Sequence, residues 1–129
     1  MKPTVLIERQ DAIAIVTLSH PGKMNALTLS MWQDLGDVMT ELSADFSVRC
    51  VVLRGAGEQA FAAGADVGEF PSVRANQAQA RVYAEVTSAA MRAVADCPHP
   101  VIAMIHGVCV GGGLEIAALC DLRICGSSS

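Results

Sequence analysis

The stretch at residues 100–121 decides the fold and reads PVIAMIHGVCVGGGLEIAALCD. Its apolar run 101–105 predicts a buried strand, and the apolar segment 114–119 predicts a short helix. Three glycines, 111–113, lie between them. The first main-chain N–H groups of a helix have no partner inside it, and the helix dipole adds positive potential there. We therefore expect the N–H group of Gly112 to donate to an oxygen outside the chain. Because glycine has no Cβ, such an oxygen can approach the main chain closely.

A second loop of small residues occurs at 60–66, AFAAGAD, after a predicted strand at 48–53. Main-chain N–H groups at this junction are likewise candidate donors. Two such donors from two loops would form an oxyanion hole, in which the loss of one donor typically lowers a rate about 10²–10³-fold. The alternative is a tight turn at 111–113 that binds nothing. We interpret Asp66 as a helix N-cap or turn residue rather than a catalytic group.

Glu115 lies in the first turn of the predicted 114–119 helix, between apolar neighbours. This position would let its carboxylate face the same pocket as Gly112, and a carboxylate in an apolar wall suits acid/base catalysis. The alternative is an acidic residue that the helix dipole stabilises and that has no chemical role. We interpret His106 as a structural histidine, and His20 and His99, which adjoin prolines, as turn residues.

The other elements alternate between strand and helix. Further strands are predicted at 5–8, 12–18 and 122–125, and helices at 30–43 and 77–97. A capping box at Ser30 is expected to open the first helix, and Pro98 to stop the second. The buried stripe expected on the second helix consists of Val82, Val86, Ala89, Ala90 and Val94. This order predicts a single α/β domain over 1–129.

Composition and charge exclude several functions. The chain is 52% hydrophobic and 17% charged, with a net charge of −4, and its basic residues are scattered singly. We therefore expect no binding of nucleic acid. No run approaches the roughly 18 apolar residues of a membrane span, and five cysteines without a CxxC pair indicate reduced thiols and no metal site. We expect a cytoplasmic protein, with neither a P-loop nor a dinucleotide-binding glycine motif.

Four segments in register resemble the crotonase, or enoyl-CoA hydratase/isomerase, superfamily. They are HPGKMNAL at 20–27, AFAAGAD at 60–66, PVIAMIHG at 100–107, and GGGLE at 111–115 with the pair Cys120-Asp121. Each is weak alone, but their order and spacing agree along all 129 residues. The resemblance implies an α/β fold of the crotonase ββα spiral type, of which this chain would be the N-terminal portion.

The resemblance also implies acyl-CoA chemistry through an enolate-like intermediate, with Ala65 and Gly112 as the oxyanion-hole donors. Glu115 matches one of two catalytic glutamates of the hydratases. The implied acyl-CoA site comprises Lys23, Met24, Ala26, Ala63, Ala65, Asp66, Val67, Gly68 and Gly112. Coenzyme A would be part of the substrate, so no separate cofactor is expected. The expected assembly is a homo-oligomer, a trimer or hexamer.

Two departures from the hydratase pattern bear on the reaction. The second glutamate of the hydratases would follow Ser129, and Gly68 stands where hydratases often have a lysine. Hydration of a 2-enoyl-CoA is the expected activity of a complete site. The alternatives are another reaction of the superfamily, such as isomerisation or decarboxylation, or an inactive chain that associates with copies of itself.

Overall fold

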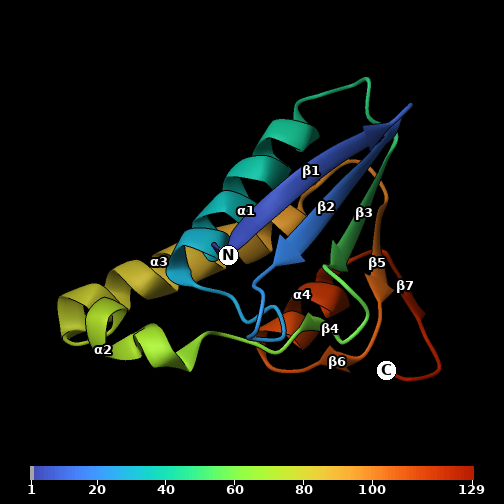
Figure 1. The fold of residues 1–129 in the computed structure, drawn as a ribbon. Coiled ribbons are helices and arrows are strands. Elements are labelled where there is room, and N and C mark those ends of the chain that lie inside the picture. The colour runs from blue at the N-terminus through green and yellow to red at the C-terminus, as the bar shows by residue number, and fades with distance from the viewer. Residues whose placement is uncertain (1) are drawn as a thin grey trace.

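In the main sheet of this α/β protein, the strands lie side by side in the order in which they occur along the chain. The computed structural model describes residues 2–129 and is shown in Figure 1. Its strands and helices are, in order, β1 (Thr4–Gln10), β2 (Ile13–Ser19), α1 (Leu29–Ser43), β3 (Cys50–Gly55), β4 (Ala60–Ala62), a 3-10 turn (Val67–Glu69), α2 (Phe70–Val73), α3 (Gln77–Ala95), β5 (Val101–Ile105), β6 (Val108–Cys109), α4 (Gly112–Leu119) and β7 (Leu122–Cys125). Strands β1-β2-β3-β5-β7 form the main sheet, and β4-β6 form a small second one.

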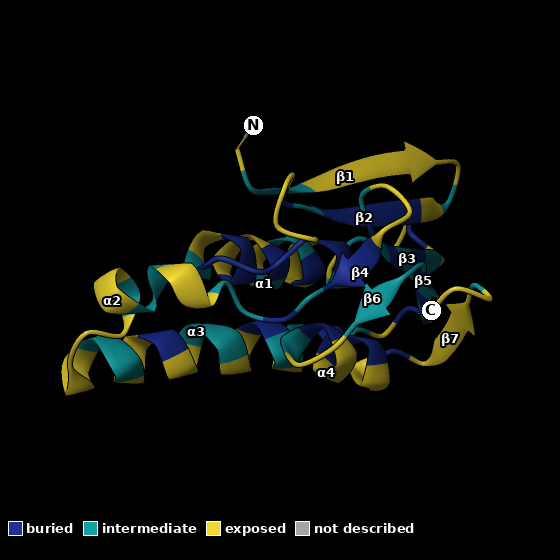
Figure 2. Ribbon diagram, turned by 60° about the horizontal axis from the view of Figure 1, so that its bottom comes forward, coloured by how far each residue is buried: buried dark blue, intermediate teal, exposed yellow. Residues whose placement is uncertain are grey.

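The predicted hairpin is confirmed, because β1 pairs antiparallel with β2 while the later strands of the main sheet run parallel. Burial alternates along β3 and β5, as expected for strands with one covered face. Helix α1 contacts β1 of the sheet and α3 packs against α1, and Figure 2 shows the buried sides of both helices facing the interior. The core between them is apolar and includes Val16, Leu18, Leu35, Met39, Val51, Leu53, Val94 and Ala103.

The predicted start of α1 is wrong, and the predicted buried stripe of α3 is correct only in part. The N-cap of α1 is Thr28, whose side chain accepts a hydrogen bond from the N–H of Met31, so the helix begins before Ser30. In α3, Val82 and Ala89 are exposed. The buried positions of that helix are Tyr83, Ala90 and Val94. Ala90 and Val94 of the predicted stripe are thus confirmed as buried, and Val86 packs against the core. Ala90 lies against Gly36 of α1, where a Cβ on the glycine would be 3.4 Å from the Cα of Ala90.

Asn25 fixes the loop between β2 and α1. It is buried, with a φ of 57°, a left-handed conformation that asparagine tolerates better than most residues. Its side-chain oxygen accepts from the N–H of His20 at 3.0 Å, and its Nδ2 donates to the carbonyls of Ala56 and Ala60 at 3.0 and 2.9 Å. The side chain therefore connects the HPGKMNAL loop with the segment that leads into β4.

We expect Asn25→Asp to destabilise the protein by about 3 kcal/mol at neutral pH, because a carboxylate oxygen would replace the donor facing two buried carbonyls. Backbone conformation and size are preserved, so the lost donor is the main change. Since the new carboxyl group would ionise less readily in the folded state, its penalty should shrink as the pH falls and the group is protonated. Urea unfolding at neutral and acidic pH measures this difference, and equal stability of variant and parent at neutral pH would contradict it.

Candidate active site

The two glycine-rich loops meet at the N-terminus of α4. A Cβ built on Gly64 would lie 3.6 Å from the nitrogen of Gly112, and one built on Gly112 would lie 4.0 Å from the nitrogen of Ala65. The small sheet brings them together, since β4 precedes one loop and β6 precedes the other. The structure therefore places the N–H groups of Ala65 and Gly112 side by side.

The neighbours of Ala65 hold its peptide in a fixed orientation. Leu27 forms a parallel bridge with Ala65, in which the N–H of Leu27 donates to Gly64 at 2.7 Å and the N–H of Asp66 donates to Leu27 at 2.8 Å. Peptide groups alternate in direction along an extended chain, so the N–H of Ala65 points away from Leu27. Within residues 2–129 this N–H has no acceptor.

Gly112 is the first residue of α4, so its N–H has no acceptor inside the helix. Among the described residues no loop oxygen accepts from it either. Gly111, at φ 54° and ψ −127°, turns the chain sharply before the helix, a conformation that glycine adopts readily. The dipole of α4 adds positive potential at this point. Both N–H groups thus lack an acceptor within residues 2–129, and the two loops that carry them lie against each other.

Glu115 is exposed, and the apolar wall expected around it is absent from the described part of the chain. The reason is the rotation of α4, which turns Gly113, Ile116 and Ala117 toward the core. Glu115 lies on the opposite side of the helix, one turn after Gly112 and on roughly the same face. Its side chain is exposed to solvent, one helical turn after the first residue of α4.

The other predicted site residues surround this point in two groups. Lys23 and Met24 are exposed, Ala26 is buried, and Ala63 is half-buried and donates its N–H to Met24 at 3.0 Å. Met24 also lines an open groove of about 720 Å³, together with the 107–110 segment. This first group lies on the loop beside the donors.

The second group follows Ala65. The side chain of Asp66 caps the 3-10 turn by accepting from the N–H of Gly68 at 3.1 Å, which confirms its interpretation as an N-cap. Val67 and Gly68 are exposed. Because both residues are exposed, the proposed site is open to solvent on the side where the chain continues into α2.

Trp32 is a site residue that sequence reasoning missed. Its indole packs against Gly112, where a Cβ would lie 2.9 Å from Cζ2 of the ring. Trp32 is the only tryptophan of the chain, and this was the only sequence feature that set it apart from the other apolar residues of the predicted helix. The ring therefore lies directly against the first residue of α4.

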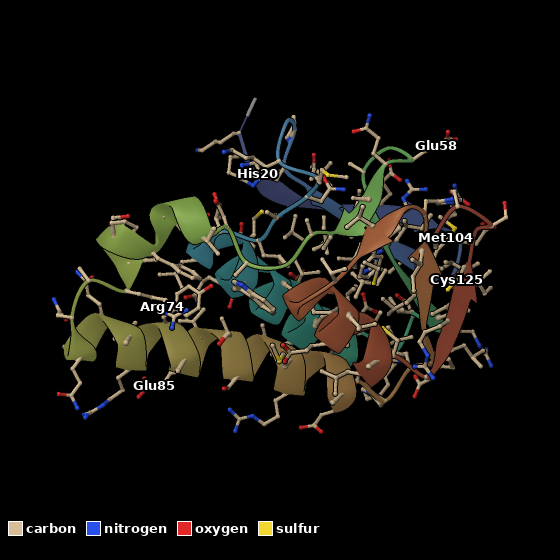
Figure 3. All side chains as sticks on the ribbon, turned by 90° about the horizontal axis from the view of Figure 1, so that it is seen from below. His20, Glu58, Arg74, Glu85, Met104 and Cys125 are labelled. Atoms are coloured by element: carbon tan, nitrogen blue, oxygen red, sulfur yellow. The ribbon has the colours of Figure 1, made fainter. Side chains whose placement is uncertain are left out.

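Two histidines are buried rather than in exposed turns, so their interpretation as turn residues is incomplete. His20 directly follows β2 and is the first residue of the HPGKMNAL loop (Figure 3). Its Nδ1 is 2.7 Å from the carbonyl oxygen of Ala26. Nε2 of His99 is 2.9 Å from the carbonyl oxygen of Leu42. Both side chains therefore stabilise the main chain around them.

The model of the enoyl-CoA hydratase/isomerase family matches residues 8–129 of this chain. The chain belongs to this family. A short-chain-enoyl-CoA hydratase of Clostridium acetobutylicum is 35% identical over 97% of the chain and 47% of the relative. The alpha subunit of a fatty acid oxidation complex from Shewanella frigidimarina is 35% identical over 93% of the chain and 17% of that subunit.

Solved structures of the enoyl-CoA hydratase/isomerase family share its fold. An enoyl-CoA hydratase/carnithine racemase from Magnetospirillum magneticum has a TM-score of 0.92 and 51% identity, covering 96% of the chain and 46% of the neighbour. For an enoyl-CoA hydratase from Bacillus anthracis the TM-score is 0.89 at 32% identity, over 97% and 48%. The chain spans about half the length of these proteins and corresponds to the N-terminal portion of the crotonase fold.

No helix within residues 2–129 is long and apolar enough to cross a membrane. The same residues contain no group of three or more His, Cys, Asp or Glu side chains that could hold a metal ion. Burial raises the pKa of the Cys120 thiol to about 12, which keeps it protonated and unreactive at neutral pH.

Proposed function

We propose that this chain carries the acyl-CoA site of an enoyl-CoA hydratase-like protein, in which the N–H groups of Ala65 and Gly112 bind the thioester oxygen. The observation that supports this proposal is that the two N–H groups lie on adjoining loops and that neither has an acceptor in the described chain. When water adds to a conjugated enoyl thioester, negative charge develops on that oxygen. Two fixed donors stabilise this charge more than the neutral carbonyl, and so lower the barrier.

Glu115 is the acid/base group of this proposal. In hydration the water oxygen bonds to C3 of the enoyl group, one proton of the water leaves, and C2 takes up a proton. The Glu115 carboxylate lies one helical turn from Gly112 and on nearly the same face, so it is placed to accept the proton that leaves the water. Coenzyme A belongs to the substrate and supplies no separate cofactor chemistry.

The coenzyme A part of the substrate would follow the loop at Lys23–Ala26 into the groove beside it. This open groove has a volume of about 720 Å³ and is lined in part by Met24 and Val110. Lys23 is exposed and directly precedes Met24 in the chain, so its ammonium could offset the charge of Glu58, which also lines the groove. Val110, another lining residue, lies two positions before Gly112, so the groove lies beside one of the proposed donors.

We expect the wild-type chain to hydrate crotonyl-CoA, and Glu115→Gln to lower the rate at least about 100-fold, because the amide keeps the size but cannot take the proton. The decay of the conjugated-enoyl absorbance measures both rates. A wild-type rate no higher than that of the variant would contradict hydration by this chain.

The second candidate is an inactive homo-oligomer, and one observation favours association. Apolar side chains are exposed on β7 and α4, namely Leu114, Leu119, Leu122 and Ile124, and contiguous apolar surface marks contact sites. Sedimentation velocity on the preparation used for the rate assay separates the outcomes. A monomer that turns over crotonyl-CoA would contradict this candidate, and an inactive oligomer would support it.

A further inference from the structure

The side chain of Glu69 caps the start of α1 from a distant part of the chain. Its Oε1 accepts a hydrogen bond from the N–H of Leu29, the first residue of α1 and forty positions earlier. The first N–H groups of a helix have no acceptor inside it, and the helix dipole favours a negative charge there. The first turn of α1, which the structure describes completely, contains no acidic residue. Glu69 therefore supplies a charge that this helix does not supply itself.

Thr28 forms a second cap on the same helix. Its hydroxyl oxygen accepts from the N–H of Met31 at 3.1 Å. The two caps differ in what they connect, because Thr28 lies directly before α1, whereas Glu69 lies in the 3-10 turn that follows the Ala65 loop. Loss of either cap would weaken the first turn of α1. Only the loss of Glu69 would also release a distant segment.

The direction of the Ala65 N–H depends on the strand-like contact beside Glu69. The carbonyl of Gly64 and the N–H of Ala65 belong to one planar trans peptide and so point in opposite directions. The N–H of Leu27 donates to that carbonyl at 2.7 Å, and the N–H of Asp66 donates to the carbonyl of Leu27 at 2.8 Å. As long as this bridge is closed, the N–H of Ala65 points away from Leu27.

The hydrogen bond of Glu69 lies close to this bridge along both segments. Its donor Leu29 is two positions after Leu27, and Glu69 is three positions after Asp66. Between them, the N–H of Glu69 donates to the carbonyl of Asp66 at 3.2 Å. The main-chain bridge and the carboxylate thus hold the same two segments together at neighbouring points.

The segment 67–73, which includes Glu69, has few other attachments. None of its residues, all of which the structure describes, is buried. Among the described residues, its only hydrogen bond to α1 or to the loop before α1 is the one between Glu69 and Leu29. On the side of α3, the rings of Phe70 and Tyr83 meet edge-to-face with centroids 5.8 Å apart. A segment with so few contacts opens readily when one of them is removed.

Packing beneath α2 is also incomplete. An apolar hollow of about 320 Å³ lies between the start of α1, α2 and α3, and its lining includes Leu29, Val73 and Val82. Side chains that border such a hollow lack part of the dispersion contact that close packing provides. The hydrogen bond at Leu29 therefore carries a larger share of the attachment of this segment to α1.

We propose that Glu69 is a positioning residue, whose carboxylate holds the 3-10 turn against α1 and so keeps the Leu27–Ala65 bridge closed and the N–H of Ala65 in place. The use of this N–H as a donor rests on the proposed acyl-CoA site, whereas the hydrogen bond of Glu69 does not. A donor displaced by about 1 Å stabilises a transition state far less. Glu69 would thus influence the rate without contacting the substrate.

Initial rates of crotonyl-CoA hydration test this role with three variants. Glu69→Ala removes the acceptor and should lower kcat about tenfold or more, with a smaller factor in KM, because the donor acts mainly on charge that develops in the transition state. Glu69→Gln keeps an oxygen that can accept from Leu29 and should retain most of the wild-type kcat. Thr28→Val removes the other cap of α1 at nearly constant shape and should leave kcat nearly unchanged.

Amide hydrogen exchange followed by NMR gives a readout that needs no turnover. In the wild type the Leu29 amide should be protected, although the first N–H of a helix has no helical acceptor. In Glu69→Ala, the amides of Leu27 and Asp66 should exchange about tenfold faster than in the wild type, because a hydrogen bond to a charged group no longer holds the bridge closed. Glu69→Gln and Thr28→Val should keep both amides protected.

Three outcomes would overturn the role of Glu69 and leave the proposed acyl-CoA site standing. They are an unprotected Leu29 amide in the wild type, wild-type exchange at Leu27 and Asp66 in Glu69→Ala, and a loss of kcat in Glu69→Ala no larger than that in Thr28→Val. An inactive wild type would contradict the proposed function instead, and the exchange rates alone would then decide the role of Glu69. The wild-type Leu29 amide decides even where Glu69→Ala fails to fold.

Discussion

Gly107→Ala should destabilise the protein by more than about 4 kcal/mol, the largest effect expected from a single methyl group here. Gly107 has a φ of 67°, and a Cβ built on it would lie 2.0 Å from the carbonyl oxygen of Gln59. That carbonyl accepts the N–H of Val108 at 3.0 Å and so holds β6 beside β4. Relief of the clash would separate these strands, which position both glycine-rich loops. Urea unfolding measures the loss of stability.

Gly57→Ala is the matched control for this prediction. Its φ of 72° is nearly the same, but a Cβ there would have no atom within 4 Å. It should therefore show only the cost of the left-handed conformation, about 1 kcal/mol. Similar losses for the two variants would show that the close approach of Gly107 to Gln59 contributes nothing to stability.

Gly112→Pro should lower the rate of crotonyl-CoA hydration about 10²–10³-fold, because proline removes one of the two proposed donors. Proline is well tolerated at the first position of a helix, where the N–H has no helical partner. The residue before it, Gly111, has φ 54° and ψ −127°. This is the mirror image of the extended conformation required before proline, and glycine adopts either hand, so α4 should persist. Initial rates, with circular dichroism to check the fold, measure the effect.

Gly112→Ala separates the lost donor from the added bulk. Both variants add a Cβ near the Trp32 ring, 2.9 Å from Cζ2 when built on the present backbone. Alanine keeps the N–H, so its rate should stay well above that of the proline variant. Equal rates for the two variants would show that crowding of Trp32, rather than loss of the N–H, causes the defect.

Local pattern predicted much of the fold because periodicity records which face of an element is covered. The hairpin, the strand at 101–105 and the helix after the glycines were all confirmed. The buried face of α3 was predicted in part: Ala90 and Val94 are buried, but Tyr83 is buried in place of Val82. Propensity does not report the contacts between distant segments that decide this.

The proposed site rests on the main chain, so the glycine-rich loops pointed to Gly112, and the family resemblance added Ala65. The exposure of Glu115 depends on which side of α4 packs against the core, and the packing of Trp32 against Gly112 depends on how α1 meets α4. No local motif encodes either contact.

The order of the strands has a consequence for folding kinetics. In the main sheet β1-β2-β3-β5-β7, spatial order equals chain order. Each new strand therefore joins the edge left by the one before it, and no strand has to insert between two that are already paired. Assembly can proceed vectorially as the chain leaves the ribosome, and the longest loop to be closed is the connection 56–100 between β3 and β5. The hairpin β1-β2 should be the first part to acquire hydrogen-exchange protection, and the β7 edge the last.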